Sequence, residues 1–272
     1  MSFNRLQNQL KTLEDQWVLS LYQDQKGYWW IGANKGIFLY DETNDKLRLI
    51  QLNSNGTSET LIFNRVIEQV NSNQILLAGQ KVFLLTNPWD AILNDKAIEI
   101  ENELFDAGNS NQINDYAKDS FGNHWFTSSK GVFRVEVQTD HWLVKDYFTT
   151  SSKNKSLALS YNHVFSIHVA SNKTVWLGTY GGGLMRVDLD AKGIPENIKS
   201  YHRNDGLRDE VIYGILEDSE GMLWMSTDMG ICYLNLNDEV FNFYDVNDGV
   251  LSNNFRQSAF LKTREGIMLM GE

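Results

Sequence analysis

Three aspartates recur at one spacing and are the most obvious candidates for chemistry in this sequence. Each is followed by a glycine three residues later and a tryptophan three residues after that. Carboxylates could act as general acids and bases or as metal ligands. Glycoside hydrolysis needs two carboxylates close together, whereas one aspartate per repeat keeps these apart. We predict that they close hairpin turns, in which Asp accepts hydrogen bonds from nearby amides and Gly takes a positive φ. The residues predicted to be structural are Asp24, Gly27, Trp30, Asp119, Gly122, Trp125, Trp176, Asp218, Gly221 and Trp224.

The histidines and the single cysteine form no pattern of a metal or nucleophile site. Neither His-x-x-x-His nor His-Glu-x-x-His occurs, and one cysteine can form neither an internal disulfide nor a two-cysteine zinc site. We expect His124 and His163 to lie in turns or at the rim, and Cys232 to be a buried packing thiol within a strand. The five histidines are His124, His141, His163, His168 and His202.

Two acidic segments begin like calcium loops but depart from that pattern. In Asp188–Gly193 a lysine occupies a ligand place, and Lys199 stands where the bidentate glutamate belongs; in Asp245–Gly249 the glycine comes one place early. Both are predicted to be turns beside an outer strand. Thr179–Gly183 is glycine-rich but leads from strand to strand, without the helix N-terminus of a phosphate site. The sequence therefore predicts no catalytic residue, no metal site, no cofactor and no enzymatic activity.

The overall charge restricts the partners. The 272 residues carry a formal net charge of -11 and a pI of about 4.9, with Lys and Arg scattered rather than clustered. A nucleic-acid-binding domain needs a basic stripe, so no nucleic-acid partner is expected. No apolar run reaches the ~18 residues of a transmembrane helix, and the first residues do not resemble a signal peptide.

The aspartate motif belongs to an internal repeat. Trp125, Trp176 and Trp224 are 51 and 48 residues apart, and the 95 residues from Trp30 to Trp125 are about two such periods. The missing member falls near Leu76. Each period contains four short apolar runs, named strands a to d below, which are separated by turn residues. Periods of this length with four strands are typical of β-propellers.

The predicted fold is all-β: a β-propeller of four-stranded antiparallel blades, with about five full blades and a partial sixth. Strands a and b are apolar on both faces, so stacking of neighbouring blades must supply the core. We expect a single domain over residues 1–272 that is a piece of a propeller with an incomplete ring, and weak helical periodicity only over residues 6–17. Blades two and four lack motif residues and are assigned by spacing. The predicted blades span residues 17–62, 63–111, 112–161, 162–209, 210–253 and, in part, 254–272.

Blade geometry nominates one surface for ligand binding. In a four-stranded blade the d–a and b–c connections lie on one face, and the a–b turn lies on the other. The aspartate motif is thus on the structural face, whereas the other connections vary from blade to blade around a central funnel. The residues predicted to contact a ligand there are Asn34, Lys35, Asn64, Arg65, Asn114, Lys130, Asn162, His163, Tyr180, Asp209, Asp228, Asn254 and Arg256.

The fullest repeat, Ile212 to Leu234, follows the pattern Val/Ile-x-x-Ile-x-x-Asp-x-x-Gly-x-Leu-Trp-x-x-Thr-x-x-Gly-Ile. Residues 204–207 and 247–254 supply Asn-Asp-Gly junctions between blades. Together these motifs resemble the two-component regulator propeller repeat. The last unit, which starts over Phe255 to Phe260 and has Leu269 in the tryptophan place, is similar to the final blade of that family.

The resemblance implies a sensor rather than an enzyme. Such propellers form the periplasmic or otherwise extracytoplasmic input region of bacterial membrane receptors with a histidine kinase or diguanylate cyclase output. A small-molecule or carbohydrate ligand would bind on the central loop face. The partners implied are downstream domains of the same protein, namely a three-tyrosine β-sandwich, a transmembrane segment and the output domain. A homodimer is compatible with this reading.

Two other functions remain alternatives. A propeller lyase or hydrolase acting on glycans would need a histidine and a carboxylate on neighbouring central loops, and His163 with Asp209 is the pairing that the sequence offers. A protein-docking or oligomerisation platform would need exposed aromatic side chains on an outer strand, for example around Phe241 and Phe243.

Overall fold

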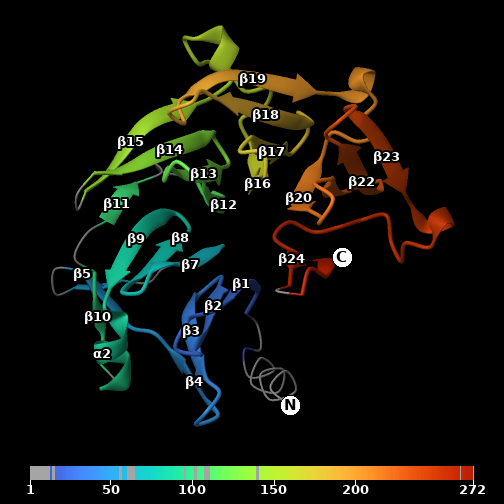
Figure 1. Ribbon diagram of the computed structural model, residues 1–272. Helices are drawn as coiled ribbons and strands as arrows, with labels where there is room; N and C mark the ends of the chain where they lie inside the picture. Colours follow the sequence, from blue (N-terminus) through green and yellow to red (C-terminus); the bar gives the residue numbers. More distant parts are fainter. Residues whose placement is uncertain are drawn as a thin grey trace. The chain divides into compact units, whose positions relative to one another are not determined.

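The structure, a computed structural model, is built from small sheets that follow one another along the chain (Figure 1). It describes residues 13, 16–54, 57–59, 65–94, 96–100, 103–106, 111–138, 141–263 and 265–271. The chain forms two compact units that divide after Ile113, named here the N-terminal and the C-terminal unit. Five of the described sheets are four-stranded and antiparallel, which confirms the predicted blade architecture. The single domain and the blade limits stay predictions.

The N-terminal unit contains two of these four-stranded sheets. Their strands are β1 (Val18–Gln23), β2 (Trp29–Ala33), β3 (Gly36–Asp41) and β4 (Lys46–Leu49), then β7 (Val66–Asn71), β8 (Gln74–Ala78), β9 (Lys81–Thr86) and β11 (Glu103–Asp106). In both sheets each strand pairs with the next one of its set along the chain. Ile75 occupies in β8 the place that Trp30 has in β2, and both side chains are fully buried. The second blade therefore keeps strand b without the tryptophan.

An insertion without a counterpart in the predicted repeat interrupts this unit. A short helix, α2 (Pro88–Leu93), follows β9, and a three-stranded sheet forms from β5 (Leu52–Ser54), β6 (Thr57–Glu59) and β10 (Ile98–Glu99). The proline at the start of α2 is tolerated because the first turn of a helix has no use for its missing amide. Helical periodicity was expected only over residues 6–17, most of which lie outside the described residues. The helix α2, which was not predicted, corrects that expectation.

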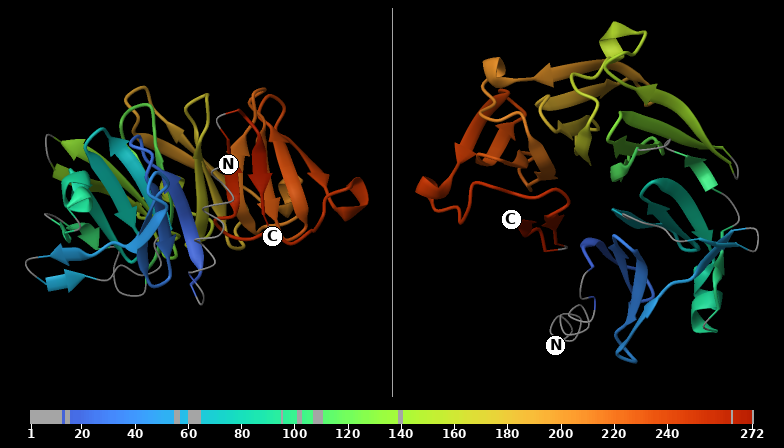
Figure 2. Two further views of the ribbon diagram at one scale, coloured as in Figure 1. Left: turned by 90° about the horizontal axis from the view of Figure 1, so that it is seen from below. Right: turned by 180° about the vertical axis from the view of Figure 1, so that it is seen from behind.

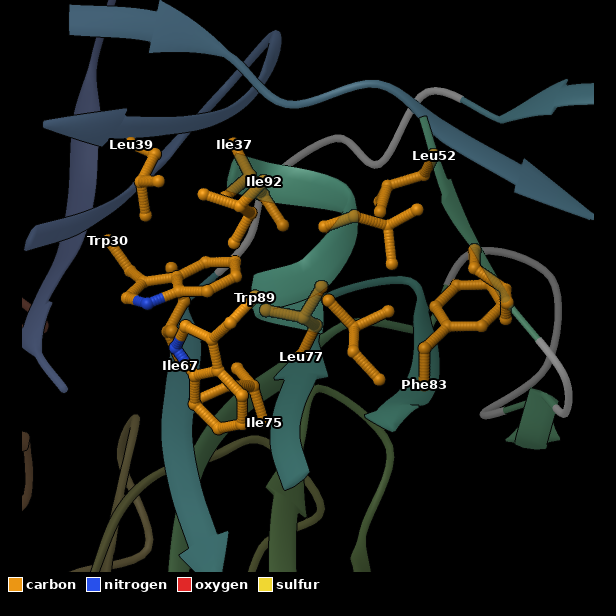
Figure 3. Packing of buried hydrophobic residues seen from close by; sticks show 13 residues of the cluster. Trp30, Ile37, Leu39, Leu52, Ile67, Ile75, Leu77, Phe83, Trp89 and Ile92 are labelled. Carbon is orange, nitrogen blue, oxygen red and sulfur yellow. The ribbon is translucent and has the colours of Figure 1, made fainter. Parts of the chain in front are cut away.

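The core of the N-terminal unit joins both four-stranded sheets to α2 (Figure 3). Trp89 of α2 packs beside Trp30, and both indole nitrogens donate to Oδ2 of Asp24. The distance is 3.0 Å from Trp89 and 2.9 Å from Trp30. The Lys26 ammonium lies 4.5 Å from the centre of the Trp89 ring. Because the second blade has no tryptophan on strand b, the inserted helix provides the large aromatic side chain of this core.

The C-terminal unit contains three four-stranded sheets and a two-stranded ribbon. Their strands are β12 (Ile113–Lys118), β13 (His124–Ser128), β14 (Val132–Gln138), β15 (His141–Phe148), β16 (Val164–Val169), β17 (Val175–Thr179), β18 (Leu184–Leu189), β19 (Pro195–Tyr201), β20 (Ile212–Glu217), β21 (Leu223–Thr227), β22 (Gly230–Asn235), β23 (Val240–Tyr244), β24 (Phe260–Lys262) and β25 (Met268–Met270). The β16–β19 and β20–β23 sheets lie side by side in both views (Figures 1 and 2). Trp176 of β17 and Ile212 of β20 belong to one buried cluster, so the space between these two sheets is core.

The repeated aspartate closes the turn between strands a and b. In the β12–β13 hairpin, Oδ1 of Asp119 accepts hydrogen bonds from the amides of Phe121 and Asn123. Its Oδ2 accepts from the Asn123 side chain and, at 2.8 Å, from the indole of Trp125. Gly122 has φ +88°, which glycine adopts without steric cost. The Asp24 and Asp218 carboxylates likewise accept from amides two and four residues on and from the indole six residues on. The turn was predicted, but the bond from carboxylate to indole was not.

The β16–β17 hairpin forms a similar turn without the aspartate or the glycine. Ala170 stands in the aspartate place, and Lys173 takes the glycine place with φ +72°. The indole of Trp176 donates instead to Oγ1 of Thr174 at 2.8 Å, and the Thr174 hydroxyl donates to Asn172. The assignment of this blade by spacing is confirmed, because all four of its strands are present.

The partial sixth repeat is the β24–β25 ribbon. In its turn Oγ1 of Thr263 accepts from the amide of Ile267, and Gly266 has φ +87°, so a threonine takes the aspartate place. Leu269 stands in the tryptophan place, as predicted. The sequence placed the start of this unit over Phe255 to Phe260, and its first strand, β24, begins at the last of these residues. Phe255 is buried and its amide donates to the carbonyl of Thr227, which ties it to the preceding blade.

The two acidic segments are turns, as predicted. Oδ1 of Asp190 accepts from the amides of Lys192 and Ile194, and this closes the β18–β19 hairpin. Asp245 caps a short 3-10 helix, η3 (Val246–Asp248), by accepting from the amide of Asn247. Within the described part of the chain, no helix is both long and apolar enough to cross a membrane.

Candidate functional site

In the N-terminal unit, the predicted ligand-binding residues that the structure describes lie at two places, the β2–β3 turn and the residue before β7. Oδ1 of Asn34 accepts from the amide of Trp17 at 2.8 Å, so this side chain holds the segment before β1. Lys35 follows it and is exposed. Arg65 precedes β7, and burial lowers the pKa of its guanidinium. Asn64 lies outside the described residues.

Two predicted residues of the C-terminal unit are buried and engaged in structural contacts. The Asn114 amide group donates to the carbonyl of Val164 at 2.8 Å and thus links β12 to β16. The Asp209 carboxylate accepts from the amides of Val211 and, at 2.9 Å, of Asp228. This geometry favours a positioning role for Asn114 and Asp209, and their contact with a ligand stays a prediction.

Three further predicted residues belong to separate loops. The carbonyl of Lys130 accepts from the Tyr147 hydroxyl, and Oδ1 of Asn162 accepts from the amide of Thr150. The amide of Asn254 donates to the Ser252 hydroxyl. Lys130 and Asn254 are exposed.

Aromatic side chains from two neighbouring blades meet where the remaining predicted residues lie. The rings of His163 and Tyr180 both contact Phe165, with centroids 4.7 and 5.2 Å away. Phe165 in turn stacks on Tyr213 of β20, with 5.5 Å between centroids and 18° between planes. Tyr180 is 49% exposed and Phe165 only 7%, so Tyr180 presents the ring surface to solvent and Phe165 supports it.

Charged groups border these rings. The Tyr213 hydroxyl donates to Oδ1 of Asp228 at 2.9 Å. Burial raises the pKa of Tyr213 to about 12, Asp228 and Tyr180 reinforce that rise, and Arg256 opposes it. Tyr213 therefore stays a neutral hydrogen-bond donor, and Arg256 lies within electrostatic range of it. We name His163, Phe165, Tyr180, Tyr213, Asp228 and Arg256 the Tyr180 patch.

Glycines fix the loop that carries Tyr180. Gly183 has φ +72°, and a Cβ atom there would collide with the backbone carbonyl of Tyr201. A Cβ atom on Gly182 would collide with the side chain of Tyr161. The amides of Gly181 and Gly183 both donate to the carbonyl of Glu210. The glycine-rich segment thus holds Tyr180 against the next blade, in agreement with its predicted strand-to-strand course.

Sequence reasoning missed Phe165 and Tyr213, although both belong to the Tyr180 patch. It considered loops, whereas these two residues stand at the second position of strand a, in β16 and β20. The usable signal was an aromatic residue at this position in two consecutive repeats. The corresponding residues of the preceding blades, Ile67 and Asn114, are not aromatic.

The described contacts do not assemble a nucleophile with its base. The carboxylate of Asp209, the proposed partner of His163, already accepts hydrogen bonds from two backbone amides. Ser171, Glu217 and His168 do meet, but the serine hydroxyl and the histidine both bond to the glutamate, 2.6 and 3.2 Å away. A hydrolase triad instead places histidine between serine and carboxylate. Among the described residues no group of three or more His, Cys, Asp or Glu side chains could hold a metal ion.

His124 corrects one expectation from the sequence. It is a buried residue of β13, 3% exposed, and lies in neither a turn nor a rim. Its Nδ1 lies 2.8 Å from the Tyr116 hydroxyl, and its ring contacts Trp142. Burial, helped by Lys118 and opposed by Asp119, lowers its pKa to about 4, so the ring is neutral near pH 7.

On the outer strand β23, Phe241 and Phe243 are partly buried, whereas Tyr244 is 41% exposed and stacks on Trp224 and Tyr233. Phe241 packs edge-on against Tyr201 in the core, and Phe243 lies 4.7 Å beneath the Arg208 guanidinium. In β23 the more exposed side chains are Val240 and Tyr244.

The repeat itself matches a known protein family. The family model described as "Two component regulator propeller" matches residues 12–35 and 206–229, which contain the aspartate turns of the first and the fifth blade, at Asp24 and Asp218. The chain carries the two component regulator propeller repeat. Three of the turns that this repeat builds are the Asp–Trp hairpins at Asp24, Asp119 and Asp218.

Known proteins with this repeat architecture include receptor parts. A curated relative, histidine kinase P4 of Formosa agariphila, is 23% identical over 54% of this chain. The extracellular domain of a hybrid two component system from B. thetaiotaomicron is 24% identical over 93% of this chain, with a TM-score of 0.70. The chain spans 14% of the former protein and 32% of the latter. At this identity the structural likeness establishes the propeller fold.

Propeller enzymes share the fold at lower similarity. Virginiamycin B lyase from Staphylococcus aureus is 13% identical to the chain, with a TM-score of 0.56 over 92% of the chain and 82% of the lyase. Fold alone therefore does not separate a sensor from a lyase, and the side chains of the site must decide.

Proposed function

We propose that this propeller is the ligand-binding input part of a bacterial signal-transduction receptor and works without catalysis. The observation that carries the proposal is the Tyr180 patch, to which loops and inner strands of two neighbouring blades contribute. A supported aromatic face beside a few polar groups is the usual make-up of a small-ligand site. The repeat in receptor proteins of related sequence supports the signalling context.

The patch suits a ligand with a flat, weakly polar face and hydroxyl groups at its edge, such as a carbohydrate ring. The exposed ring of Tyr180 would carry that face, since Phe165 backs it and limits its motion. Asp228 would accept from hydroxyls, and Arg256 would donate to them. The position of Asp228 is fixed in advance by Asp209 and Tyr213, which lowers the cost of ordering the site.

The receptor context extends the proposal beyond this chain. The propeller would lie on the extracytoplasmic side, and the rest of the receptor would supply the three-tyrosine β-sandwich, the membrane segment and the kinase or cyclase output. Ligand at the patch would bridge two blades and bind one arrangement of their loops more tightly than the other. Signalling needs such a difference in affinity between two conformations. A homodimer fits the proposal as well.

Binding can be tested by calorimetric titration of the purified chain with a panel of neutral and acidic oligosaccharides. Tyr180→Ala should weaken the affinity for the bound sugar at least about tenfold, because the stacking surface is lost. Tyr244→Ala is the matched control, since Tyr244 is 41% exposed on β23 and does not belong to the patch. Equal binding by wild type and Tyr180→Ala would contradict the proposed site.

Signalling and catalysis need separate readouts. In the full receptor, Tyr180→Ala should abolish the ligand-dependent output while the amount of receptor in the membrane stays unchanged. Mass spectrometry of the titrated sugars should find them intact after incubation with the chain. Cleaved or eliminated products would favour the lyase or hydrolase instead.

A further inference from the structure

A second candidate binding site lies in the N-terminal unit, along the segment that leads from β4 to β5. A hollow of about 330 Å³ is lined by Lys35, Ile37 and Asn53, among others, and an adjoining hollow of about 130 Å³ by Arg48, Ile92 and Lys96. The two share Leu49, Ile50 and Gln51 and therefore adjoin along this segment; together they are named here the β4–β5 groove.

Three cationic side chains line this groove. Lys35 comes from the β2–β3 turn, Arg48 from β4, and Lys96 from the segment after α2. The acidic Glu99 of neighbouring β10 accepts a hydrogen bond from Asn53 at 3.0 Å. In a chain with a net charge of -11, three cations along this groove are a local departure that would attract anions.

The floor of the groove is fixed in advance. The amide of Ile50 donates to the carbonyl of Ile37, and the carbonyl of Gln51 accepts from the amide of Ile98. Each of these hydrogen bonds is 2.8 Å long. The segment is thus held by β3 on one side and by β10 on the other. Leu49 lies 53% exposed on the floor and offers an apolar surface between the cations.

These backbone bonds also indicate the kind of ligand. A peptide that adds to a sheet edge needs main-chain groups to pair with. Here Ile50 and Gln51 already use an amide and a carbonyl within the unit, so recognition falls to the side chains. Lysine and arginine side chains bind carboxylate and sulfate groups, and the Gln51 and Asn53 amides suit hydroxyls.

We propose that the β4–β5 groove binds an extended acidic oligosaccharide, whose acidic groups pair with Lys35, Arg48 and Lys96 while a sugar face covers Leu49. This site is additional to the Tyr180 patch and does not depend on it. The groove is lined by the end of the first repeat, Lys35 to Ile37, together with α2 and the inserted β5 segment.

The test is calorimetric titration of the whole chain with tetragalacturonate. Wild type should bind it, and the affinity should fall between about 50 mM and about 300 mM salt, since the contacts are ionic. The double variant Lys35→Gln/Lys96→Gln should bind about tenfold more weakly. Lys46→Gln is the matched control, because Lys46 is an exposed lysine of the same sheet that does not line the groove. Maltotetraose, of equal length without charge, should bind at least about tenfold more weakly than tetragalacturonate.

Several results would overturn the proposal. These are the absence of tetragalacturonate binding, unchanged affinity in the double variant, or equal affinity for maltotetraose. Equal affinity for tetraglutamate would overturn it as well, since it would indicate an unspecific attraction of anions. Tyr180→Ala should leave tetragalacturonate binding unchanged, so failure at this groove and failure at the Tyr180 patch can be told apart.

Discussion

The β12–β13 and β16–β17 hairpins occupy equivalent places in consecutive blades and form similar turns with different side chains. The first closes on its own carboxylate, Asp119, which also accepts the indole of Trp125. The second has no such carboxylate and directs its indole to Thr174. A carboxylate of the next blade, that of Glu217, contacts this turn and accepts from both the amide and the hydroxyl of Ser171.

This difference separates the part of the motif that the fold needs from the part that it can replace. Both hairpins keep a residue with positive φ and an acceptor for a buried indole. The aspartate is one way to supply that acceptor, and it makes the turn self-sufficient. Where it is missing, a carboxylate from the neighbouring blade helps to hold the turn. The turn of blade four therefore depends on blade five, whereas the turn of blade three is held by its own aspartate.

Among the variants of these two hairpins, removal of Asp119 is expected to lower the stability most. Asp119→Ala leaves the indole nitrogen of Trp125, which is fully buried, without its acceptor, and the Asn123 side chain loses one of its two acceptors. We expect the free energy of unfolding, measured with urea, to fall by about 4 kcal/mol. Asp190→Ala is the control, since Asp190 makes the same two amide bonds in an exposed turn without an indole. An equal loss in both variants would mean that the indole bond contributes nothing.

The pH dependence of stability should differ between the two blades because of their histidines. The pKa of His124 in the folded state is about 4, below its ordinary value of 6.5. Between these values the unfolded chain binds a proton that the folded chain does not, so stability should fall by up to about 3 kcal/mol as the pH drops from 6.5 to 4. Burial also lowers the pKa of His168, but Glu217 opposes that shift, so its effect has the same sign and a smaller size.

Urea midpoints at several pH values check this expectation. His124→Phe should flatten the loss of stability on the acid side, whereas His168→Phe should change it less. Parallel pH profiles for wild type and His124→Phe would show that another group titrates in this range.

The smallest effect is expected at the substitute acceptor of blade four. Thr174→Val keeps the shape of the side chain but removes the oxygen that accepts from Trp176. The unfolding free energy should fall by about 2 kcal/mol, the net value of the two hydrogen bonds that the hydroxyl makes with Trp176 and Asn172. Thr174→Ser should recover most of it. If valine is tolerated and serine is not, packing of the methyl group rather than the hydrogen bond stabilises the turn.

The repeated features of the fold could be predicted from the sequence, and the unrepeated ones could not. Strands around Trp30, Trp125, Trp176 and Trp224 follow from a spacing that recurs, and even the blade around Ile75 was found by its period alone. Helix α2 and the sheet of β5, β6 and β10 occur once, in a segment of six helical residues and very short strands, where periodicity carries no signal.

The candidate site was predictable only in part, for a related reason. The loops of His163, Tyr180 and Asp228 could be nominated from blade topology, because connections on one face must come near each other. Burial could not be anticipated for Asn114 and Asp209, which look like other polar loop residues in the sequence. The contributions of Phe165 and Tyr213 depend on how adjacent inner strands pack, which sequence spacing does not determine.

The shared acceptor in the N-terminal unit has a consequence for how that unit opens. One oxygen of Asp24 binds two indoles whose residues are far apart in the chain, Trp30 in the local hairpin and Trp89 in the inserted helix. Opening of the first turn must therefore release the helix in the same event. In hydrogen-exchange measurements the amides of this hairpin and those of α2 should exchange with solvent as one cooperative unit, despite the second blade that separates them in sequence.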